Sequence, residues 1–133
     1  DGGITAANSG HEAIMSPTSH CYLDYDLKAI DLEKVYNFDP IPTDLKKDKH
    51  HFIIGGEVNM WTEHVPDENN LDSKVFPRIL AMSEVLWRYP KERNYEEFYS
   101  RVQYHYPMLE KLGVKYGDET VPFSYFLKPS EGG

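Results

Sequence analysis

Residues 55–63 of this chain read GGEVNMWTE, and this stretch decides how the fold is interpreted. It follows the apolar run FII at residues 52–54 and carries a tryptophan and a carboxylate two residues apart. Because a β-strand has a period of two residues, we expect Trp61 and Glu63 on one face at the end of a strand. An aromatic ring stacks on the C–H face of a sugar, and a carboxylate accepts hydrogen bonds from sugar hydroxyls. A sugar site is one interpretation, and a core tryptophan beside a solvated glutamate is the other.

The composition is that of one globular domain without a nucleic-acid or membrane signature. The 133 residues include 40% hydrophobic and 14% aromatic side chains, enough for a core. A formal net charge of −8 argues against a nucleic-acid partner and does not repel a neutral sugar. No apolar run approaches the roughly 20 residues that span a bilayer. The single Cys21 excludes an internal disulfide framework. The 6 histidines show no metal-ligand spacing, so we expect neither a metal nor another cofactor.

Apolar periodicity and helix-breaking residues predict two successive strand–loop–helix units. The first has a buried strand at 13–16, a loop at 17–26 and a short helix capped by Asp31. The second has a strand at 51–59, a polar loop at 62–72 and a helix at 74–88 with Pro77 near its first turn. Two parallel βα units fit this order. Active sites of parallel α/β folds lie at the C-terminal ends of the strands, where both loops are rich in aromatic and acidic residues.

The ends of the chain carry further helix signals. A helix tail stops near Gly10, and Asn94 caps a last helix with Glu97 placed for a capping-box contact. Pro107 predicts a kink in that helix, and Gly113 fits the position after its end. The tail is expected to pack as a strand or loop. The predicted buried positions on the two long helices are Val75, Ile79, Met82 and Leu86, then Phe98, Val102, His105, Leu109 and Leu112.

Several short sequence motifs in this chain resemble those of one enzyme family. GGExxMWxE at 55–63, FPR at 76–78 and AMSEVLW at 81–87 resemble the end of the catalytic barrel of glycoside hydrolase family 20, the β-N-acetylhexosaminidases. MSP at 15–17 and CYLD at 21–24 form a second block in the expected order. The resemblance runs from Ile14 to about Tyr116. It implies an α/β fold, a fragment of a (β/α)8 TIM barrel with its last two βα units and C-terminal tail, so that residues 1–133 form an incomplete domain.

The resemblance also implies roles for four side chains. Enzymes of this family use no protein nucleophile, because the acetamido oxygen of the substrate attacks C1. Tyr22 matches the family tyrosine whose hydroxyl donates to that oxygen, a catalytic role. Asp24 matches a residue that contacts a distal sugar hydroxyl, Trp61 matches the floor of the sugar pocket, and Glu63 matches the acid that binds the non-reducing hydroxyls. An ordinary half-buried tyrosine and a turn-stabilising aspartate are the plainer interpretations of the first two.

Other residues of the motifs have structural interpretations. Glu57 shares the strand face of Trp61. One interpretation places it in the barrel interior, where a buried acid needs partners, and we expect a structural or supporting role for it. Arg78, Glu84 and Trp87 lie on a helix away from the strand ends, so burial with an ion pair is the expectation.

The family's general acid is missing from this chain. Members carry an Asp-Glu pair on an earlier strand, and neither Asp67-Glu68 nor Asp118-Glu119 fits that place. A full barrel needs about 250 residues and eight strands. Both ends of the chain look like cut points in a longer one. Because the general acid is missing, we expect the isolated chain to be inactive. The expected partners are glycans ending in N-acetylglucosamine or N-acetylgalactosamine, the upstream part of the barrel, and further copies of the fragment. A non-catalytic carbohydrate-binding module and a structural subunit of a split enzyme are the alternatives.

Overall fold

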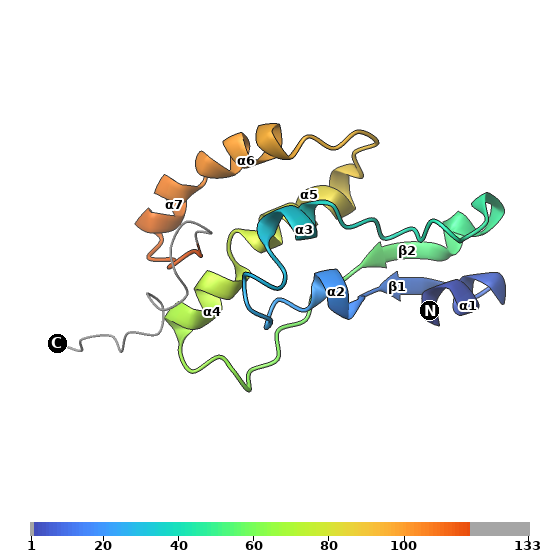
Figure 1. Cartoon of the computed structure of the whole chain (residues 1–133), viewed down its shortest axis with the longest axis horizontal. Coiled ribbons are helices and arrows are strands. Elements are labelled where there is room, and N and C mark those ends of the chain that lie inside the picture. The colour runs from blue at the N-terminus through green and yellow to red at the C-terminus, as the bar shows by residue number, and fades with distance from the viewer. Residues whose placement is uncertain (1, 118–133) are drawn as a thin grey trace.

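The computed structural model describes residues 2–117, which form an elongated α/β unit (Figure 1). Figure 1 places the sheet and α1 at one end of the molecule and α4 and α7 at the other. The expected strand or loop around Pro122, Phe123, Tyr125 and Phe126 lies outside the described residues. The elements, in chain order, are α1 (Gly2–Asn8), β1 (Ala13–Met15), α2 (Thr18–Cys21), α3 (Leu32–Tyr36), the 3₁₀ helix η1 (Lys47–Phe52), β2 (Ile53–Gly56), α4 (Glu68–Val75), α5 (Arg78–Arg88), α6 (Tyr95–Gln103) and α7 (Tyr106–Lys111).

Strands β1 and β2 form a parallel two-stranded sheet, as two βα units require. Ala13 pairs with Ile53 and Met15 with Gly56, with an irregularity after the first pair. The expected strand at 51–59 is shorter, because η1 occupies its start and regular pairing ends at Gly56. At Gly56 a Cβ atom would lie 3.0 Å from the Leu86 side chain and 3.2 Å from the Met15 carbonyl. A glycine therefore allows β2 to pass close to both β1 and α5.

One face of the sheet is covered and the other is bare. Ala13, Met15 and Ile53 pack on or within the core, whereas Ile14 and Ile54 expose 57% and 54% of their surface. The strand predicted at 13–16 is therefore buried only on the face that carries Met15, and the prediction of burial is wrong for the face that carries Ile14. Parallel sheets in α/β folds are normally covered on both faces.

The core is formed by the sheet, by helices α3 and α5, which pack against each other, and by α6. Asp31 caps α3 as predicted, accepting a 2.7 Å hydrogen bond at Oδ1 from the Lys34 amide. The buried side chains of the core are Met15, Cys21, Leu23, Ile30, Leu32, Val35, Tyr36, Phe38, Ala81, Met82, Val85, Phe98 and Val102.

The single helix predicted at 74–88 is two helices, α4 and α5. Phe76 is extended between them, and Pro77 is the N-cap of α5 rather than a first-turn residue. A residue before proline is sterically disfavoured in the helical region, which explains the break. The break also changes the helix face that is buried. Of the predicted stripe only Met82 is fully buried, and the other buried residues of α5 are Arg78, Ala81 and Val85.

The last predicted helix is also divided, into α6 and α7. Asn94 caps α6 by accepting a 3.1 Å hydrogen bond from the Glu97 amide, but the Glu97 carboxylate turns to Arg101 instead of completing a capping box. Instead of a kink, the helix stops at Gln103 and resumes at Tyr106, with Pro107 in the first turn. This restart shifts the buried face, so Phe98, Val102 and Leu109 are buried while His105 and Leu112, predicted buried, are exposed.

The helix stops predicted at glycines are confirmed. Gly113 has a φ of 76° and follows α7, where the amide of Val114 donates to the Leu109 carbonyl at 2.9 Å. Gly10 has a φ of 81° and ends α1 in the same manner. Among residues 2–117, no helix combines the length and the apolar character needed to cross a membrane.

Candidate functional site

The chain segments that follow β1 and β2 lie side by side. After α2, an isolated parallel bridge joins Tyr22 to Asn59. The Asn59 amide donates to the Cys21 carbonyl at 2.8 Å, and the Leu23 amide donates to the Asn59 carbonyl at 2.9 Å. The Asn59 side chain also donates to Ser16 Oγ at 2.6 Å. These bonds bring the segment that carries Tyr22 and Asp24 beside the one that leads to Trp61.

Tyr22 and Asp24 are both half-buried on the first segment. The Tyr22 ring lies 6.1 Å from that of Tyr25, measured between ring centroids, in a tilted arrangement. Oδ1 of Asp24 is buried and has no hydrogen-bond partner among the described residues. A buried carboxylate oxygen without a donor is unfavourable, so this atom is a position where a further donor would be stabilising.

Trp61 and Glu63 lie beyond the strand rather than on it. Regular pairing ends at Gly56, and the chain turns at Thr62, whose carbonyl accepts a 3.1 Å hydrogen bond from the Val65 amide. The prediction that strand geometry places both side chains on one face is therefore wrong. Trp61 exposes 55% of its surface and Glu63 is also exposed, so the tryptophan is not a core residue of residues 2–117.

Glu57 does not meet the expectation of a buried acid, because its side chain is exposed. Its backbone extends the strand pairing, with the amide donating to the Met15 carbonyl at 3.1 Å and the carbonyl accepting from Ser16 Oγ at 3.3 Å. Nearby, Cys21 is fully buried, and burial together with the Glu57 charge raises the pKa of its thiol to about 12. The Cys21 thiol therefore stays protonated at neutral pH.

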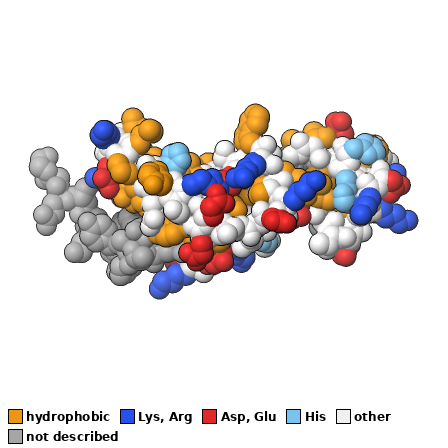
Figure 2. All heavy atoms as spheres, turned by 90° about the horizontal axis from the view of Figure 1, so that it is seen from above, with side chains coloured by type: hydrophobic (Ala, Val, Ile, Leu, Met, Phe, Trp, Pro, Cys, Tyr) orange, Lys and Arg blue, Asp and Glu red, His pale blue; other side chains and the backbone are white. Residues whose placement is uncertain are grey.

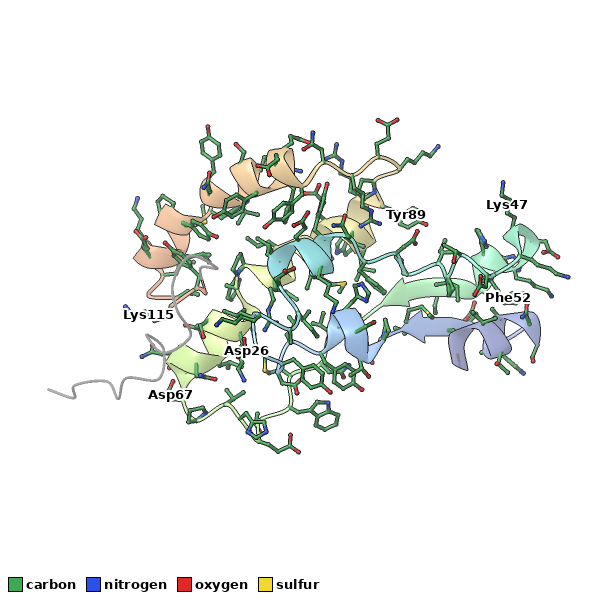
Figure 3. The ribbon with its side chains drawn as sticks, in the orientation of Figure 1. Asp26, Lys47, Phe52, Asp67, Tyr89 and Lys115 are labelled. Carbon is green, nitrogen blue, oxygen red and sulfur yellow. The ribbon has the colours of Figure 1, made fainter. Side chains whose placement is uncertain are left out.

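Arg78 is buried, as predicted, but its hydrogen-bond partners are backbone carbonyls instead of a carboxylate. One terminal nitrogen donates to the Ile30 carbonyl at 2.8 Å and to the Tyr25 carbonyl at 3.3 Å, and the other donates to the Leu23 carbonyl. Burial lowers the pKa of Arg78, and the charges of Asp24 and Asp26 oppose that shift. These hydrogen bonds from Arg78 fix the conformation of the loop after Tyr22. Figure 3 labels Asp26 on this loop and Asp67 at the start of α4.

Of the other two motif residues on α5, Glu84 meets the expectation of an ion pair and Trp87 does not meet the expectation of burial. Glu84 makes the predicted ion pair, accepting from Arg101 of α6 at 2.6 and 2.7 Å. Arg88 lies 3.4 Å from the same carboxylate. Trp87, predicted buried, exposes 89% of its surface, because the opposite face of α5 packs on the core.

Lys74 is a buried residue that the sequence analysis did not single out. Its Nζ donates to the Asp24 carbonyl at 2.7 Å and to the His64 carbonyl at 3.0 Å. Burial lowers the pKa of Lys74, the charge of Arg78 lowers it further, and those of Asp24 and Asp26 raise it. No periodic pattern in the sequence signals these contacts, because both acceptors are backbone carbonyls.

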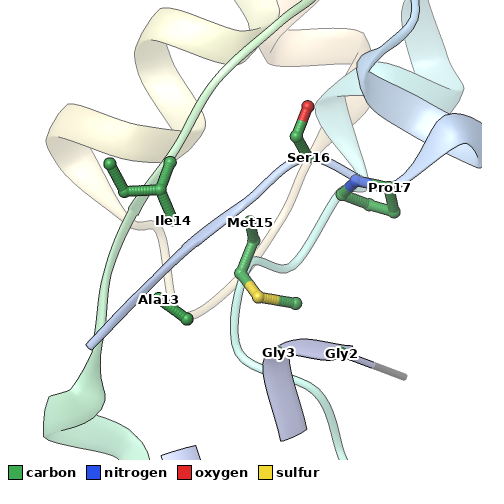
Figure 4. A pocket seen from close by; sticks show the side chains of 7 residues that line it. All are labelled: Gly2, Gly3, Ala13, Ile14, Met15, Ser16 and Pro17. Carbon is green, nitrogen blue, oxygen red and sulfur yellow. The ribbon is translucent and has the colours of Figure 1, made fainter. Parts of the chain in front are cut away.

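A pocket of about 330 Å³ lies elsewhere, beside β1 (Figure 4). Its lining consists of Gly2 and Gly3 of α1 and residues 13–17, with Met15 pointing towards Gly3 in Figure 4. None of the four candidate sugar-site residues lines it. Within residues 2–117, no three histidine, cysteine or acidic side chains cluster as metal ligands.

Comparisons with known proteins agree on one family. Residues 1–90 match the family described as "Glycosyl hydrolase family 20, catalytic domain". The chain is 34% identical over 128 residues to a β-hexosaminidase of Porphyromonas gingivalis, covering 87% of this chain and 16% of that protein. It is 32% identical over 124 residues to a β-N-acetylhexosaminidase of Cellulomonas fimi, covering 85% of this chain and 25% of that protein.

A solved structure gives the same result at the level of the backbone. The family 20 exo-β-N-acetylglucosaminidase of Vibrio harveyi, in complex with N-acetylglucosamine, superposes with a TM-score of 0.76 and 26% identity. That match covers 88% of this chain and 20% of the enzyme, which is a TIM barrel. The chain thus spans a quarter or less of the relatives named here. Because the family match includes more than half of its 133 residues, the chain belongs to glycosyl hydrolase family 20, as a piece of the catalytic domain.

Proposed function

We propose that this chain is the C-terminal part of the catalytic barrel of a β-N-acetylhexosaminidase, its seventh and eighth βα units with the tail. The whole enzyme would remove terminal N-acetylglucosamine or N-acetylgalactosamine from glycans by substrate-assisted, retaining hydrolysis. The observation that carries the proposal is the bridge between Tyr22 and Asn59. It joins the two segments that follow parallel strands, and in barrel enzymes the site is built from such segments.

In the proposed mechanism Tyr22 acts on the reacting atoms. When the acetamido oxygen attacks C1, the bond from C1 to the glycosidic oxygen breaks, the upstream general acid protonates that leaving oxygen, and positive charge develops on the acetamido group and the sugar ring. The Tyr22 hydroxyl donates a hydrogen bond to the acetamido oxygen and holds it in line for attack on C1. The half-buried position of Tyr22 supports this role, because the hydroxyl can meet a ligand while the ring is held by its neighbours.

The other three residues bind the sugar. Trp61 offers an exposed ring face for stacking, and Glu63 offers an exposed carboxylate to two hydroxyls. Asp24 has a buried oxygen without a donor from the described residues, so a sugar hydroxyl or the upstream part of the barrel can supply the missing donor. The general acid would come from the upstream Asp-Glu pair.

The proposal is tested by Tyr22→Phe in the complete enzyme, with Tyr25→Phe as the matched control in the same loop. We expect Tyr22→Phe to lower kcat by about 10², with a smaller change in KM, because the lost hydrogen bond no longer holds the attacking oxygen in line with C1. Tyr25→Phe should leave both constants close to those of the wild type. An unchanged kcat in Tyr22→Phe, or an equal loss in the two variants, would contradict the role of Tyr22.

The isolated chain should not hydrolyse a β-N-acetylglucosaminide, because a positioned general acid is worth about 10²–10⁴ in rate. Turnover by the pure chain that is lost on mutating Asp67 or Glu68 would overturn the assignment of the acid to an upstream segment. If the complete protein binds N-acetylglucosamine without hydrolysing any β-N-acetylhexosaminide, the binding-module alternative replaces the enzyme.

A further inference from the structure

We propose that Lys74 is a positioning residue that ties together the two segments of the sugar site, an inference that rests on the proposed function. The site is made from two separate pieces of chain, one carrying Tyr22 and Asp24 and the other carrying Trp61 and Glu63. Their relative position decides whether one sugar can contact both. Lys74 lies on a third element, the last turn of α4, and its ammonium group contacts both pieces.

The contacts of Lys74 fall beside the candidate ligands. The first acceptor is the backbone carbonyl of Asp24 itself, at 2.7 Å from Nζ. The second is the carbonyl of His64, at 3.0 Å, directly after Glu63 in the chain. A single nitrogen therefore lies within hydrogen-bond distance of the backbone of Asp24 and of the residue that follows Glu63. These acceptors are 50 and 10 residues from Lys74 in sequence, so the link is tertiary for the first segment.

Burial makes this link stronger than a surface contact. Lys74 is only 3% exposed, so water does not compete for its ammonium protons. Hydrogen bonds from a charged donor are shorter and stronger than neutral ones, especially away from water. The ammonium is also the flexible, three-donor group that can serve two carbonyls from different directions.

Lys74 differs in function from its neighbour Arg78. The two terminal nitrogens of Arg78 donate to the carbonyls of Leu23, Tyr25 and Ile30, within the first segment and its continuation. Its Nε donates to the Lys74 carbonyl on α4 at 2.8 Å, so among residues 2–117 no hydrogen bond of Arg78 reaches the segment with Trp61 and Glu63. Arg78 therefore shapes one segment, whereas Lys74 joins two. Charge balance around the pair comes from Asp24 and Asp26, which face both cations and favour their charged forms.

The test measures N-acetylglucosamine binding and amide hydrogen exchange in the complete enzyme. Lys74→Met keeps the length of the side chain but removes the donors, and Lys111→Met is the control, because Lys111 is also a last-turn lysine but is exposed. We expect Lys74→Met to weaken binding by about 10- to 100-fold, the scale of an ångström of misplacement. In the same variant, the rate of amide hydrogen exchange should rise in residues 22–30 and 62–66 and change little elsewhere. Lys74→Arg should recover part of the affinity, since it restores charged donors.

Two results would overturn the proposal. One is wild-type affinity and exchange in Lys74→Met. The other is a rise in exchange spread over the whole barrel, which indicates a general structural role instead of a link between two segments. If Lys74→Met does not fold, Lys74→Gln is measured instead, because its shorter amide keeps a donor without the charge. Wild-type affinity in Lys74→Gln counts against the proposal, and weaker binding with faster exchange in both segments supports it.

The two proposals fail in different ways. If the wild-type enzyme does not bind N-acetylglucosamine, the proposed function fails, while the exchange of residues 22–30 and 62–66 still reports whether Lys74 joins them. If the wild type binds and hydrolyses but Lys74→Met behaves like Lys111→Met, only the inference about Lys74 fails.

Discussion

At the scale of single residues, Arg78 illustrates how a buried cation can organise a loop without an ion pair. Its three terminal hydrogen bonds reach carbonyls 48 to 55 residues away, in the segment after β1. Each of those carbonyls is otherwise at risk of being buried without a donor, which costs about 1–3 kcal/mol per group. Arg78, the first residue of α5, therefore determines the conformation of a loop that carries two candidate site residues.

We predict that Arg78→Met in the complete protein lowers the free energy of unfolding by at least about 3 kcal/mol, because several carbonyls lose their donors at once. Arg88→Met on the same helix is the control, since the Arg88 side chain is 62% exposed, and it should change stability by less than about 0.5 kcal/mol. Urea unfolding monitored by circular dichroism measures both. Similar small losses in the two variants would show that the carbonyl contacts do not stabilise the fold.

Trp61 and Glu63 are exposed, so their removal should affect binding more than folding. In the complete enzyme, Trp61→Ala loses a stacking face for the sugar, and Glu63→Gln loses charge-assisted hydrogen bonds worth about 1.5–3 kcal/mol. Titration calorimetry with N-acetylglucosamine should therefore show weaker binding in both variants. Trp87→Ala, which removes another exposed tryptophan, should bind like the wild type. Affinity that survives both changes would remove these residues from the sugar site.

At the scale of elements, an acidic side chain fastens α6 to α5. Glu84 accepts two hydrogen bonds from Arg101, and Arg101 also contacts Glu97 at 3.1 Å within α6. The hydrogen bonds from Arg101, followed by its charge and that of Arg88, outweigh desolvation and lower the pKa of Glu84. A carboxylate whose pKa is lowered in the folded state stabilises it above the unfolded pKa, and this stabilisation is lost as the pH falls through the folded value.

We therefore predict that acid loosens the attachment of α6. The wild type should lose about 1 kcal/mol of stability between roughly pH 5 and pH 3 through this group, a surface-scale value because Arg101 is 40% exposed. Glu84→Gln should lack that stabilisation already at neutral pH and change less on acidification, whereas Glu92→Gln, at an exposed position, should follow the wild type. Unfolding curves at a series of pH values make the comparison. Parallel pH profiles for Glu84→Gln and the wild type would refute the link.

At the scale of the whole molecule, the described residues 2–117 leave a large amount of apolar surface exposed. Within this range no further strand pairs with either edge of the two-stranded sheet, and Ile14 and Ile54 are more than half exposed. Trp87 on α5 and Tyr104 and Leu112, which follow the ends of α6 and α7, are 89%, 83% and 71% exposed. Figure 2 shows apolar side chains between charges of both signs on one face. Open edges and exposed apolar surface favour association with other chains.

The isolated chain should therefore self-associate, or bind a dye that reports exposed apolar surface. Ile54→Lys should weaken both effects, because a charge on the exposed face of the sheet opposes contact with a second copy of the chain. Analytical ultracentrifugation over a range of concentrations measures the association. Ser100→Lys, at an exposed position of α6, is the control for added charge. A compact monomer that unfolds cooperatively and binds no dye would show a self-sufficient domain and favour the binding-module alternative.

The sequence by itself determined what depends on neighbouring residues. The caps at Asp31 and Asn94, the stops at Gly10 and Gly113 and the order of two parallel βα units follow from local side-chain chemistry and apolar spacing. The family motifs indicated Tyr22, Asp24, Trp61 and Glu63, whose roles remain predictions. Local pattern was a poorer guide where helices are interrupted, because Phe76 before Pro77 and the restart at Tyr106 changed which helix faces are buried.

Only the tertiary structure decided which distant groups meet. It turned Arg78 from an ion-pair partner into a donor to carbonyls, exposed Trp87, and buried Lys74 between the backbones of Asp24 and His64. The contacts of Arg78 and Lys74 leave no periodic signal, because they depend on backbone carbonyls that every residue possesses. The physical reason is that a carbonyl's need for a donor is set by burial, and burial is a property of the packed chain.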